Sequence, residues 1–377
     1  MANTSLPKEQ LFILLVLASI NFCHIMDFMI MMPMAPQLMR SFSIGPQQFS
    51  LLVASYSIAA GFASFMGTFL VDHFDRKRVL LFCFTGFLIG TFGCGFAPTY
   101  SILLAARIFT GMLGGLIGSQ VLSILADLVA PENRGKATGM VMTGFSAASV
   151  FGVPVGLYAA AEWNWKLPFF GIGFLGIAIW ILAFLVLPSV RKHIQEKSQR
   201  KNPVKTLSEI LSFRSHQLAL GFTVLVAFSH FTMIPFLSPY MVANVGFKEV
   251  QLSYIYMIGG LLTLFSGPYI GKLADRYGTA RVFSILVVVA FIPQLAITNL
   301  PPVHIGVALI FTSLFFVFSG GRFVPSQALI IGAIQPAFRG GFMSLNSSVM
   351  QLASGLAAYM AGLVVVKNPN GQFENYN

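Results

Sequence analysis

The sequence predicts an all-α polytopic membrane protein, a bundle of helices that cross a lipid bilayer many times. Of its 377 residues, 56% are hydrophobic and only 9% are charged, whereas a soluble domain carries about 25% charged residues. The apolar residues gather in runs of about 20 or more, the length that a helix needs to cross a bilayer. We mark eleven such spans, at residues 11–34, 47–71, 78–97, 99–127, 136–160, 167–188, 217–242, 250–273, 281–299, 303–333 and 341–366.

The basic residues predict how the spans are oriented. Of the 23 Lys and Arg residues, 17 fall in the N-terminal segment and in alternate connections, against four in the opposite connections. Positive charges remain on the cytoplasmic side of a membrane, so this distribution predicts a cytoplasmic N-terminus in the inner (plasma) membrane. It also accounts for the net charge of +11 without nucleic acid, and we expect membrane lipid as a partner because anionic head groups attract basic segments.

Other classes of protein are not supported by the sequence. The first apolar run is too long for a cleavable signal peptide. Cys23, Cys83 and Cys94 fall inside predicted spans, which favours small core residues over disulfide partners or metal ligands. No phosphate-binding loop, metal-ligand cluster or nucleophilic triad is apparent. We therefore expect a protein that is not an enzyme and that needs no cofactor.

The second half of the chain repeats the first. Three landmarks recur at offsets of 202 to 205 residues: the turn 72–78 recurs at 275–281, the turn 131–135 recurs at 336–340, and the proline-broken end of span one recurs at Pro235. Both copies start on the same side of the membrane, as in transporters built from parallel repeats.

The repeat divides the chain into an N-terminal six-helix half (1–188), a cytoplasmic linker (189–216) and a C-terminal half (217–377). A partner for the sixth span would begin near residue 371, where the sequence is polar. We therefore expect two six-helix halves with the twelfth helix apparently absent, so that five helices are present in the second half.

One carboxylate lies deep in the first span. Asp27 is about seven residues, or ~10 Å, from the outer end of span one, and Arg107 is about eight residues, or ~12 Å, from the outer end of span four. An unpaired charge in lipid costs several kcal/mol, so equal depth predicts a buried ion pair. We expect Asp27 to carry a proton that Arg107 helps to release when their separation changes. A static pair that only fixes helix packing is the alternative.

Two more polar residues accompany Asp27 in span one. Asn21, His24 and Asp27 are spaced at i, i+3 and i+6, and we expect them to share one helix face. His24 is a candidate proton relay, since histidine titrates near neutral pH; a hydrogen-bonding histidine in a cavity is the alternative. Asn21 is a candidate substrate contact on the same face.

Polar residues in the second half are further candidates for substrate binding. His230 falls within about a residue of the repeat position of Asp27. Arg322 lies inside span ten, and no second-half span carries a carboxylate to pair with it. Arg322 therefore attracts an anionic substrate or substrate oxygen atoms, or else rests on backbone carbonyls. Gln327 and Asn346 complete the set, although amides between helices often only hold the helices together.

The turns after spans two and eight resemble the signature of the major facilitator superfamily, Gly-x-x-x-Asp-Arg-x-Gly-x-Arg-Arg. The second copy matches it at Gly271, Asp275, Arg276, Gly278 and Arg281. The first copy departs from the signature at Thr68, His73 and Asp75.

Two other spans carry a similar resemblance. Span four, with Arg107 followed by glycines, resembles the motif that places a buried arginine in proton-coupled members of the superfamily. Span five, with Gly152, Pro154 and Gly156, resembles the antiporter motif, and these three residues should also bend the helix and allow close packing. The turn at 74–78 and residues 315–325 look most like those of bacterial arabinose-efflux-type and drug:proton antiporters.

The signature turns suggest a gate. Asp72 and Asp275 sit at the C-terminal ends of helices, where the helix dipole disfavours negative charge, so they need basic neighbours or the N-terminus of another helix. The resemblance implies that the two turns dock on spans eleven and five and hold the inner face shut in the outward-open state; a solvated loop is the alternative. The basic residues expected to take part are Arg76, Arg134, Arg276, Arg281 and Arg339.

These observations and the resemblance together predict a secondary transporter. We expect a monomer that exports a small organic molecule, such as a drug, sugar or metabolite, in exchange for protons by rocker-switch alternating access. Its substrate site should lie near the bilayer midplane, lined by spans one, four, seven and ten. A proton symporter and a non-transporting membrane receptor or scaffold are the alternatives.

Overall fold

The computed structural model describes residues 7–191, 203–335 and 338–376, without the side chains of residues 68, 69, 72, 131 and 203–206. Eleven helices in this part of the chain are long and apolar enough to cross a membrane. They coincide with the eleven predicted spans to within a few residues at each end. The all-α prediction is therefore confirmed, with one small β-hairpin added near the C-terminal end.

Most spans are single helices, but spans five and ten are interrupted by a π-helical turn, and span seven is broken by a turn after Phe231 and ends in a π-helical turn. The first half contains α1 (Lys8–Ile30), α3 (Pro46–Leu70), α4 (Arg76–Phe96), α5 (Tyr100–Leu128), α6 (Arg134–Ala147) with η3 (Ala148–Gly152) and α7 (Val153–Glu162), and α8 (Leu167–Val186). The second half contains α11 (Arg214–Phe231) with α12 (Ile234–Tyr240) and η5 (Met241–Val245), α13 (Glu249–Tyr277), α14 (Thr279–Thr298), α15 (Ile305–Phe315) with η6 (Phe316–Gly320) and α16 (Phe323–Ala333), and α17 (Arg339–Val364).

Proline breaks the first span where the sequence predicts it. Helix α1 ends at Ile30, a turn follows, and α2 (Ala35–Phe42) begins with Pro36 in its first turn, where proline is well tolerated. The connection between spans one and two is therefore largely helical. Span seven breaks in the same way, because α11 ends at Phe231 and α12 starts with Pro235 in its first turn.

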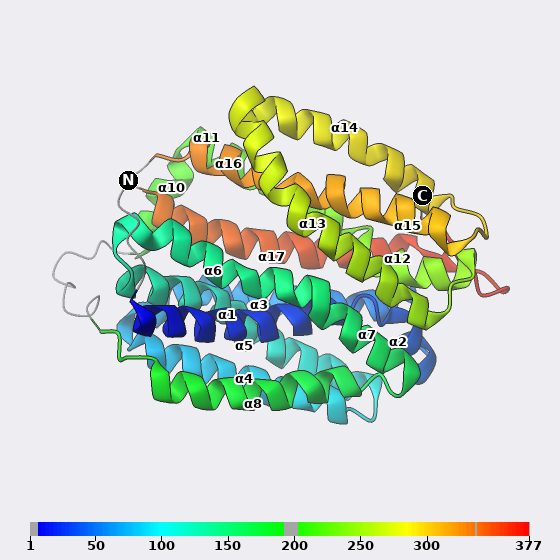
Figure 1. Cartoon of the computed structure of the whole chain (residues 1–377), viewed down its shortest axis with the longest axis horizontal. Helices are drawn as coiled ribbons and strands as arrows, with labels where there is room; N and C mark the ends of the chain where they lie inside the picture. Colours follow the sequence, from blue (N-terminus) through cyan, green and yellow to red (C-terminus); the bar gives the residue numbers. More distant parts are fainter. Residues whose placement is uncertain (1–6, 192–202, 336–337, 377) are drawn as a thin grey trace.

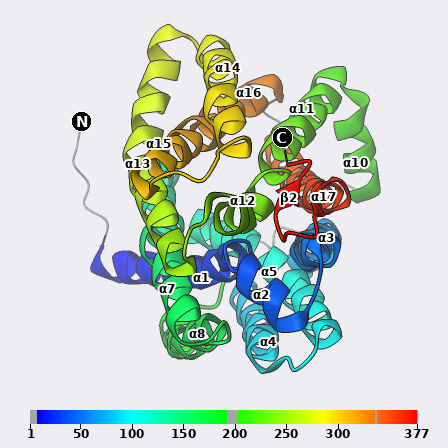
Figure 2. The ribbon, with the colours of Figure 1, turned by 90° about the vertical axis from the view of Figure 1, so that its right-hand side faces the viewer.

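Small residues bring α3 close to two neighbours. At Gly115 of α5, an added Cβ would collide with the α3 backbone at Ala60, and at Gly355 of α17 it would collide with the α3 backbone at Ala54. Helix α3 therefore packs against α5 in its own half and against α17 in the other half (Figure 2). Such close approach is how helices associate where lipid replaces water.

The two halves meet at one end of the bundle and diverge at the other. We call the end that carries Lys8 the inner end, following the predicted topology. At the outer end, Arg40 of α2 and Glu249 of α13 form an ion pair at 2.6 Å, and α13 packs against α7. Toward the inner end, α13 leans away from α6 (Figure 1), and the ion pairs of the described side chains there stay within the first half.

The described part of the linker contains one helix, α10 (Pro203–Ser212), which belongs with the second half. Its Ile210 is buried in a cluster with residues of α11, α16 and α17. The hairpin of β1 (Val366–Lys367) and β2 (Phe373–Glu374) lies at the outer end, where the amide of Asn244 bonds to the backbone of Phe373.

The lateral surfaces of the two halves, along the length of the helices, are covered to different degrees. In the first half, α8 lies against α1 and α4. In the second half, α11 and α14, which correspond to α1 and α4 in the repeat, line a groove of about 770 Å³ that also includes Arg322. Apolar side chains such as Phe291 are exposed along α14, as expected for a surface that meets lipid.

Candidate functional site

The predicted ion pair between spans one and four is present. Nη1 of Arg107 donates to Oδ2 of Asp27 at 2.7 Å, and the two side chains are 1% and 0% exposed. The hydroxyl of Thr91, on α4, donates to Oδ1 of Asp27 at 3.2 Å. Asp27 of α1 is thus bonded to Arg107 of α5 and Thr91 of α4, and both of its carboxylate oxygen atoms accept a hydrogen bond.

Helix packing around Arg107 explains how a charged side chain stays inside the bundle. Gly111 follows it by one turn, and an added Cβ there would collide with the backbone of Tyr56. This close approach places the Tyr56 ring under the guanidinium, with its centroid 4.3 Å from Cζ of Arg107. A cation over an aromatic face is stabilised by about 2 kcal/mol when it is desolvated, so Tyr56 offsets part of the burial of Arg107.

The polar residues of span one do not share one face, contrary to our expectation. Asn21 donates to the carbonyl of Val141 on α6 at 3.5 Å, whereas Asp27 faces α4 and α5. The reason is geometric: six residues rotate a helix by about 600°, which leaves the two side chains about 120° apart. His24 lies between these directions, next to Phe87, with a ring-centroid distance of 6.0 Å. Its Nδ1 is buried and has no partner among the described residues.

Aromatic rings connect the ion pair with the second half. Phe28, which follows Asp27, lies 5.5 Å from Tyr56 and 6.3 Å from Phe231 of α11, measured between ring centroids. The ring of Phe231 in turn lies 5.4 Å from that of His230. The spacing of polar residues did not reveal this contact, and Phe28 and Phe231 were not among the predicted site residues.

His230 and Arg322 meet at the hydroxyl of Ser319 in the second half. Nη2 of Arg322 donates to the carbonyl of Ser229 at 3.0 Å and to the hydroxyl of Ser319 at 3.1 Å. Nδ1 of His230 lies 3.2 Å from the same hydroxyl. Ser319 belongs to η6, and π-helical turns occur often at functional sites. Arg322 is only 4% exposed and its Nε has no partner among the described residues.

The two predicted amide contacts lie apart from this cluster. Oδ1 of Asn346 accepts a hydrogen bond from Thr223 of α11, and both side chains are buried. Gln327 is half-buried on α16. Gln351, one turn beyond Asn346, donates to Ser64 of α3 at 3.0 Å and so links the two halves.

The predicted gating residues lie at the inner end, and those whose side chains the structure describes are not joined across the halves. Arg76 pairs with Asp127 at 3.2 Å within the first half, and Arg134 donates to the carbonyls that end α5. The guanidinium of Arg276 lies over the ring of its neighbour Tyr277. The side chain of Asp72 lies outside the described residues. The remaining gating candidates, Asp275, Arg281 and Arg339, are exposed.

Asp75, which the sequence marks only as a departure from the signature, holds the start of the linker. It caps α4 through the amide of Lys77, and it accepts hydrogen bonds from Ser189, Val190 and Arg191. Burial would raise the pKa of Asp75, but these donors outweigh it and hold the pKa below its ordinary value. The hydrogen bonds to Asp75 therefore stabilise the folded protein above the ordinary pKa of an aspartate. This stabilisation is lost as the pH falls through the lowered pKa. An acceptor at an N-cap position was the signal that could have identified Asp75.

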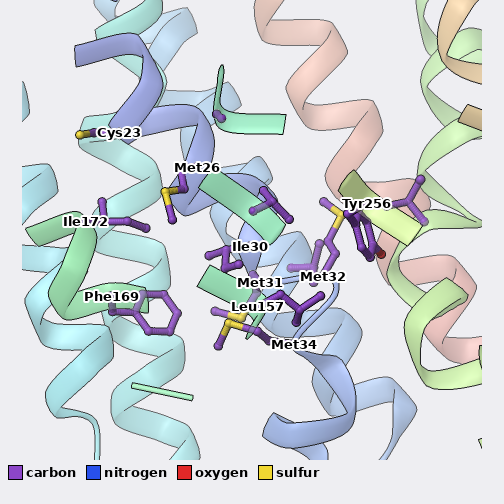
Figure 3. Close-up of a cluster of buried hydrophobic side chains, with 14 of the residues drawn as sticks. Cys23, Met26, Ile30, Met31, Met32, Met34, Leu157, Phe169, Ile172 and Tyr256 are labelled. Atoms are coloured by element: carbon purple, nitrogen blue, oxygen red, sulfur yellow. The ribbon is translucent and has the colours of Figure 1, made fainter. Parts of the chain in front are cut away.

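Span five packs tightly on span one through the residues predicted for that role. A Cβ added at Gly152 would meet Met26 and Phe22, and one added at Gly156 would meet Ile30 and Met26. Pro154 is in the first turn of α7, directly after the π-helical turn. Figure 3 shows Met26 and Ile30 of α1 with Leu157 of α7 in the same buried cluster.

The chain is similar to known proteins over nearly its full length. Residues 17–365 match the family model described as Major Facilitator Superfamily. An uncharacterized MFS-type transporter of Bacillus subtilis, YbcL, is 24% identical, covering 83% of this chain and 78% of that protein. The inner membrane transport protein YdhP of Escherichia coli is also 24% identical, over 89% of this chain and 84% of that protein.

A solved structure supports the same fold. A bacterial homolog of the human lysosomal transporter Spinster, in an inward-facing and unoccupied conformation, superimposes with a TM-score of 0.79 at 17% identity. The alignment covers 96% of this chain and 83% of that chain. At this level of identity, the similarity establishes the fold.

Proposed function

The chain belongs to the Major Facilitator Superfamily and is a secondary transporter that works by alternating access, and from this premise we propose that it exports a small organic molecule in exchange for protons. The observation that carries the proposal is the buried pair of Asp27 and Arg107. A purely structural role seldom warrants two buried charges, because desolvation offsets most of their attraction.

The proposed proton carrier is Asp27. Its carboxylate is neutralised either by Arg107 at 2.7 Å or by a proton, and these two partners compete for the same negative charge. A movement of α1 against α5 that lengthens the pair favours protonation, and a movement that shortens it favours release. His24 lies one turn away on α1 with a free ring nitrogen and is the candidate relay.

The proposed substrate contacts lie in the second half. Arg322 rests on neutral acceptors and keeps its positive charge, so it suits a substrate with acceptor oxygen atoms. His230 shares the hydroxyl of Ser319 with Arg322, and its ring lies among Phe231, Phe315 and Phe323. The export direction is inferred from the resemblance of span five to the antiporter motif, and the structure described here would be the inward-facing state.

Transport in proteoliposomes tests the proposal. Purified protein is reconstituted, pH gradients of either sign are imposed, and movement of radiolabelled sugars, cationic drugs and organic anions is followed. We expect substrate to move against the proton flow in the wild type. Asp27→Asn should lose gradient-driven accumulation and keep exchange between equal concentrations. Glu162→Gln, which removes an exposed carboxylate at the outer end of α7, is the control and should stay coupled.

The outcomes separate the alternatives. Full coupling in the Asp27→Asn protein contradicts a proton-carrying role for this residue. Movement of substrate together with protons indicates a symporter. A wild-type protein that moves none of these compounds under either gradient favours the receptor or scaffold.

A further inference from the structure

A long groove runs along the surface of the first half, between α3 and α4, with α5 as its floor. It has a volume of about 1230 Å³. Most of its lining is apolar and belongs to one continuous face, which includes Phe62, Met66, Leu70, Phe82, Ile108 and Met112.

The groove faces the bilayer rather than the interior of the transporter. The side of α3 at Gly61 meets Leu352 of α17, and the side at Tyr56 meets α5. The groove uses the remaining side of α3, and its walls are open, with Phe62 60% exposed and Phe82 71% exposed. Side chains of this kind on a membrane-spanning surface contact acyl chains.

The inner end of the groove is basic. Arg78 and His73 line it and are exposed, and Arg191 of the linker joins them. Asp75 also borders this end, but its carboxylate is already paired with Arg191 and is hydrogen-bonded to Ser189. The end of the groove that meets the head-group region therefore presents the guanidinium of Arg78, which suits a phosphate, beside the imidazole of His73.

We propose that this groove is a binding site for an anionic glycerophospholipid of the inner leaflet. The acyl chains lie along α3 and α4 on the floor of α5, and the phosphate rests on Arg78 and His73, beside the ion pair of Arg191 and Asp75. Charge complementarity selects this occupant, because the inner leaflet carries a negative surface potential that attracts basic groups at the membrane surface. A soluble phosphate would leave the apolar length of the groove without a partner, and an apolar helix would leave its basic end without one.

Fluorescence quenching tests the site. Phe62→Trp places a reporter in the groove, and Phe265→Trp on α13, where Phe265 is 73% exposed, places one on lipid-facing surface elsewhere. Purified protein is titrated in detergent with brominated phosphatidylglycerol or brominated phosphatidylcholine, and the quenching is measured relative to the protein without the added tryptophan. We expect phosphatidylglycerol to quench the groove reporter at lower concentration than phosphatidylcholine, and both lipids to quench the α13 reporter equally.

A pair of charge variants checks the phosphate contact. Arg78→Gln should weaken the preference for phosphatidylglycerol by about fivefold, the effect expected for one basic residue at a membrane surface. Lys77→Gln is the matched control, because Nζ of Lys77 donates to Phe184 on α8, outside the groove. Unbrominated phosphatidylglycerol should reverse the quenching, whereas glycerol phosphate should not.

Several results would overturn the proposal. Equal quenching of the groove reporter by the two lipids removes the anionic preference. An equal loss of the preference for phosphatidylglycerol in Arg78→Gln and Lys77→Gln shows a general effect of surface charge. Displacement by glycerol phosphate alone assigns the basic end to a soluble phosphate. Absence of quenching by either lipid shows that the groove is occupied by protein.

Discussion

Each half buries an arginine, and the two arginines have different hydrogen-bond partners. In the first half, Arg107 donates to the carboxylate of Asp27, and in the second half, Arg322 donates to the carbonyl of Ser229 and the hydroxyl of Ser319. The first arrangement pairs two opposite charges, whereas the second surrounds Arg322 with neutral acceptors. Two halves that repeat one backbone plan can therefore serve different chemistry, and on the proposed function one binds the proton and the other the substrate.

Removing each arginine should give the largest difference in stability between the two sites. Arg107→Ala leaves a buried carboxylate unpaired, which costs about 3–5 kcal/mol in comparable pairs. Arg322→Ala leaves only neutral acceptors, with an expected cost of about 1–3 kcal/mol. The measurement is the free energy of unfolding in detergent, followed by tryptophan fluorescence. Equal destabilisation by the two variants would remove the distinction between the two sites.

Removing the hydroxyl groups of Thr91 and Ser319 should give a smaller difference in the free energy of unfolding between the two sites. Thr91→Val removes a bond to a charged acceptor, worth about 1.5–3 kcal/mol, whereas Ser319→Ala removes neutral bonds worth about 1 kcal/mol. We also expect Thr91→Val to shift the pH profile of transport, because it changes the surroundings of the proposed proton carrier. Ser319→Ala should leave that profile in place, and a shift in the serine variant would assign proton handling to the second half.

The contact between Phe28 and Phe231 should couple the two regions. A double-mutant cycle with Phe28→Leu and Phe231→Leu should give an interaction of about 0.5–1.5 kcal/mol in unfolding free energy, since aromatic pairs are worth that much beyond their buried area. The pair Phe49 and Phe236, at 6.5 Å, is the control across the same halves. Only the first pair should change the number of protons moved per substrate; the same change in both would indicate general loosening.

The outer ion pair should have the smallest effect on stability. Arg40→Gln or Glu249→Gln should each cost at most about 1 kcal/mol, because Arg40 is largely exposed and its pair is screened by salt. Both changes should instead increase the reactivity of a cysteine placed at Phe49, below the contact. Exchange of the two charges should restore protection, and failure of that exchange would show that the ion pair does not hold the outer end closed.

Some features followed from the sequence because they depend on position along a helix. The eleven spans follow from apolar length, and the pairing of Asp27 with Arg107 follows from equal depth, since each residue advances a helix by about 1.5 Å. The recurrence of the proline break at Pro235 follows from the repeat offset. Each of these features can be calculated from positions along the sequence alone.

Other features depend on the direction in which a side chain points and on its neighbours. The sequence placed Asn21 and Asp27 on one face, yet they contact different helices. It gave no reason to single out Phe28, and it presented Asp75 only as a departure from a motif, although its carboxylate anchors the linker.

The sequence by itself determined that eleven helices among the described residues are long and apolar enough to cross a membrane, that the chain has a repeated transporter fold, and that Asp27 lies at the depth of Arg107. Only the tertiary structure decided that Thr91 completes the carboxylate site, that Arg322 rests on neutral acceptors, and that a groove with a basic end lies between α3 and α4. The reason is that hydrophobic length and depth are local properties of each helix. Contacts arise from the rotation and packing of helices far apart in the chain, which Gly111, Gly115 and Gly355 set through close approach.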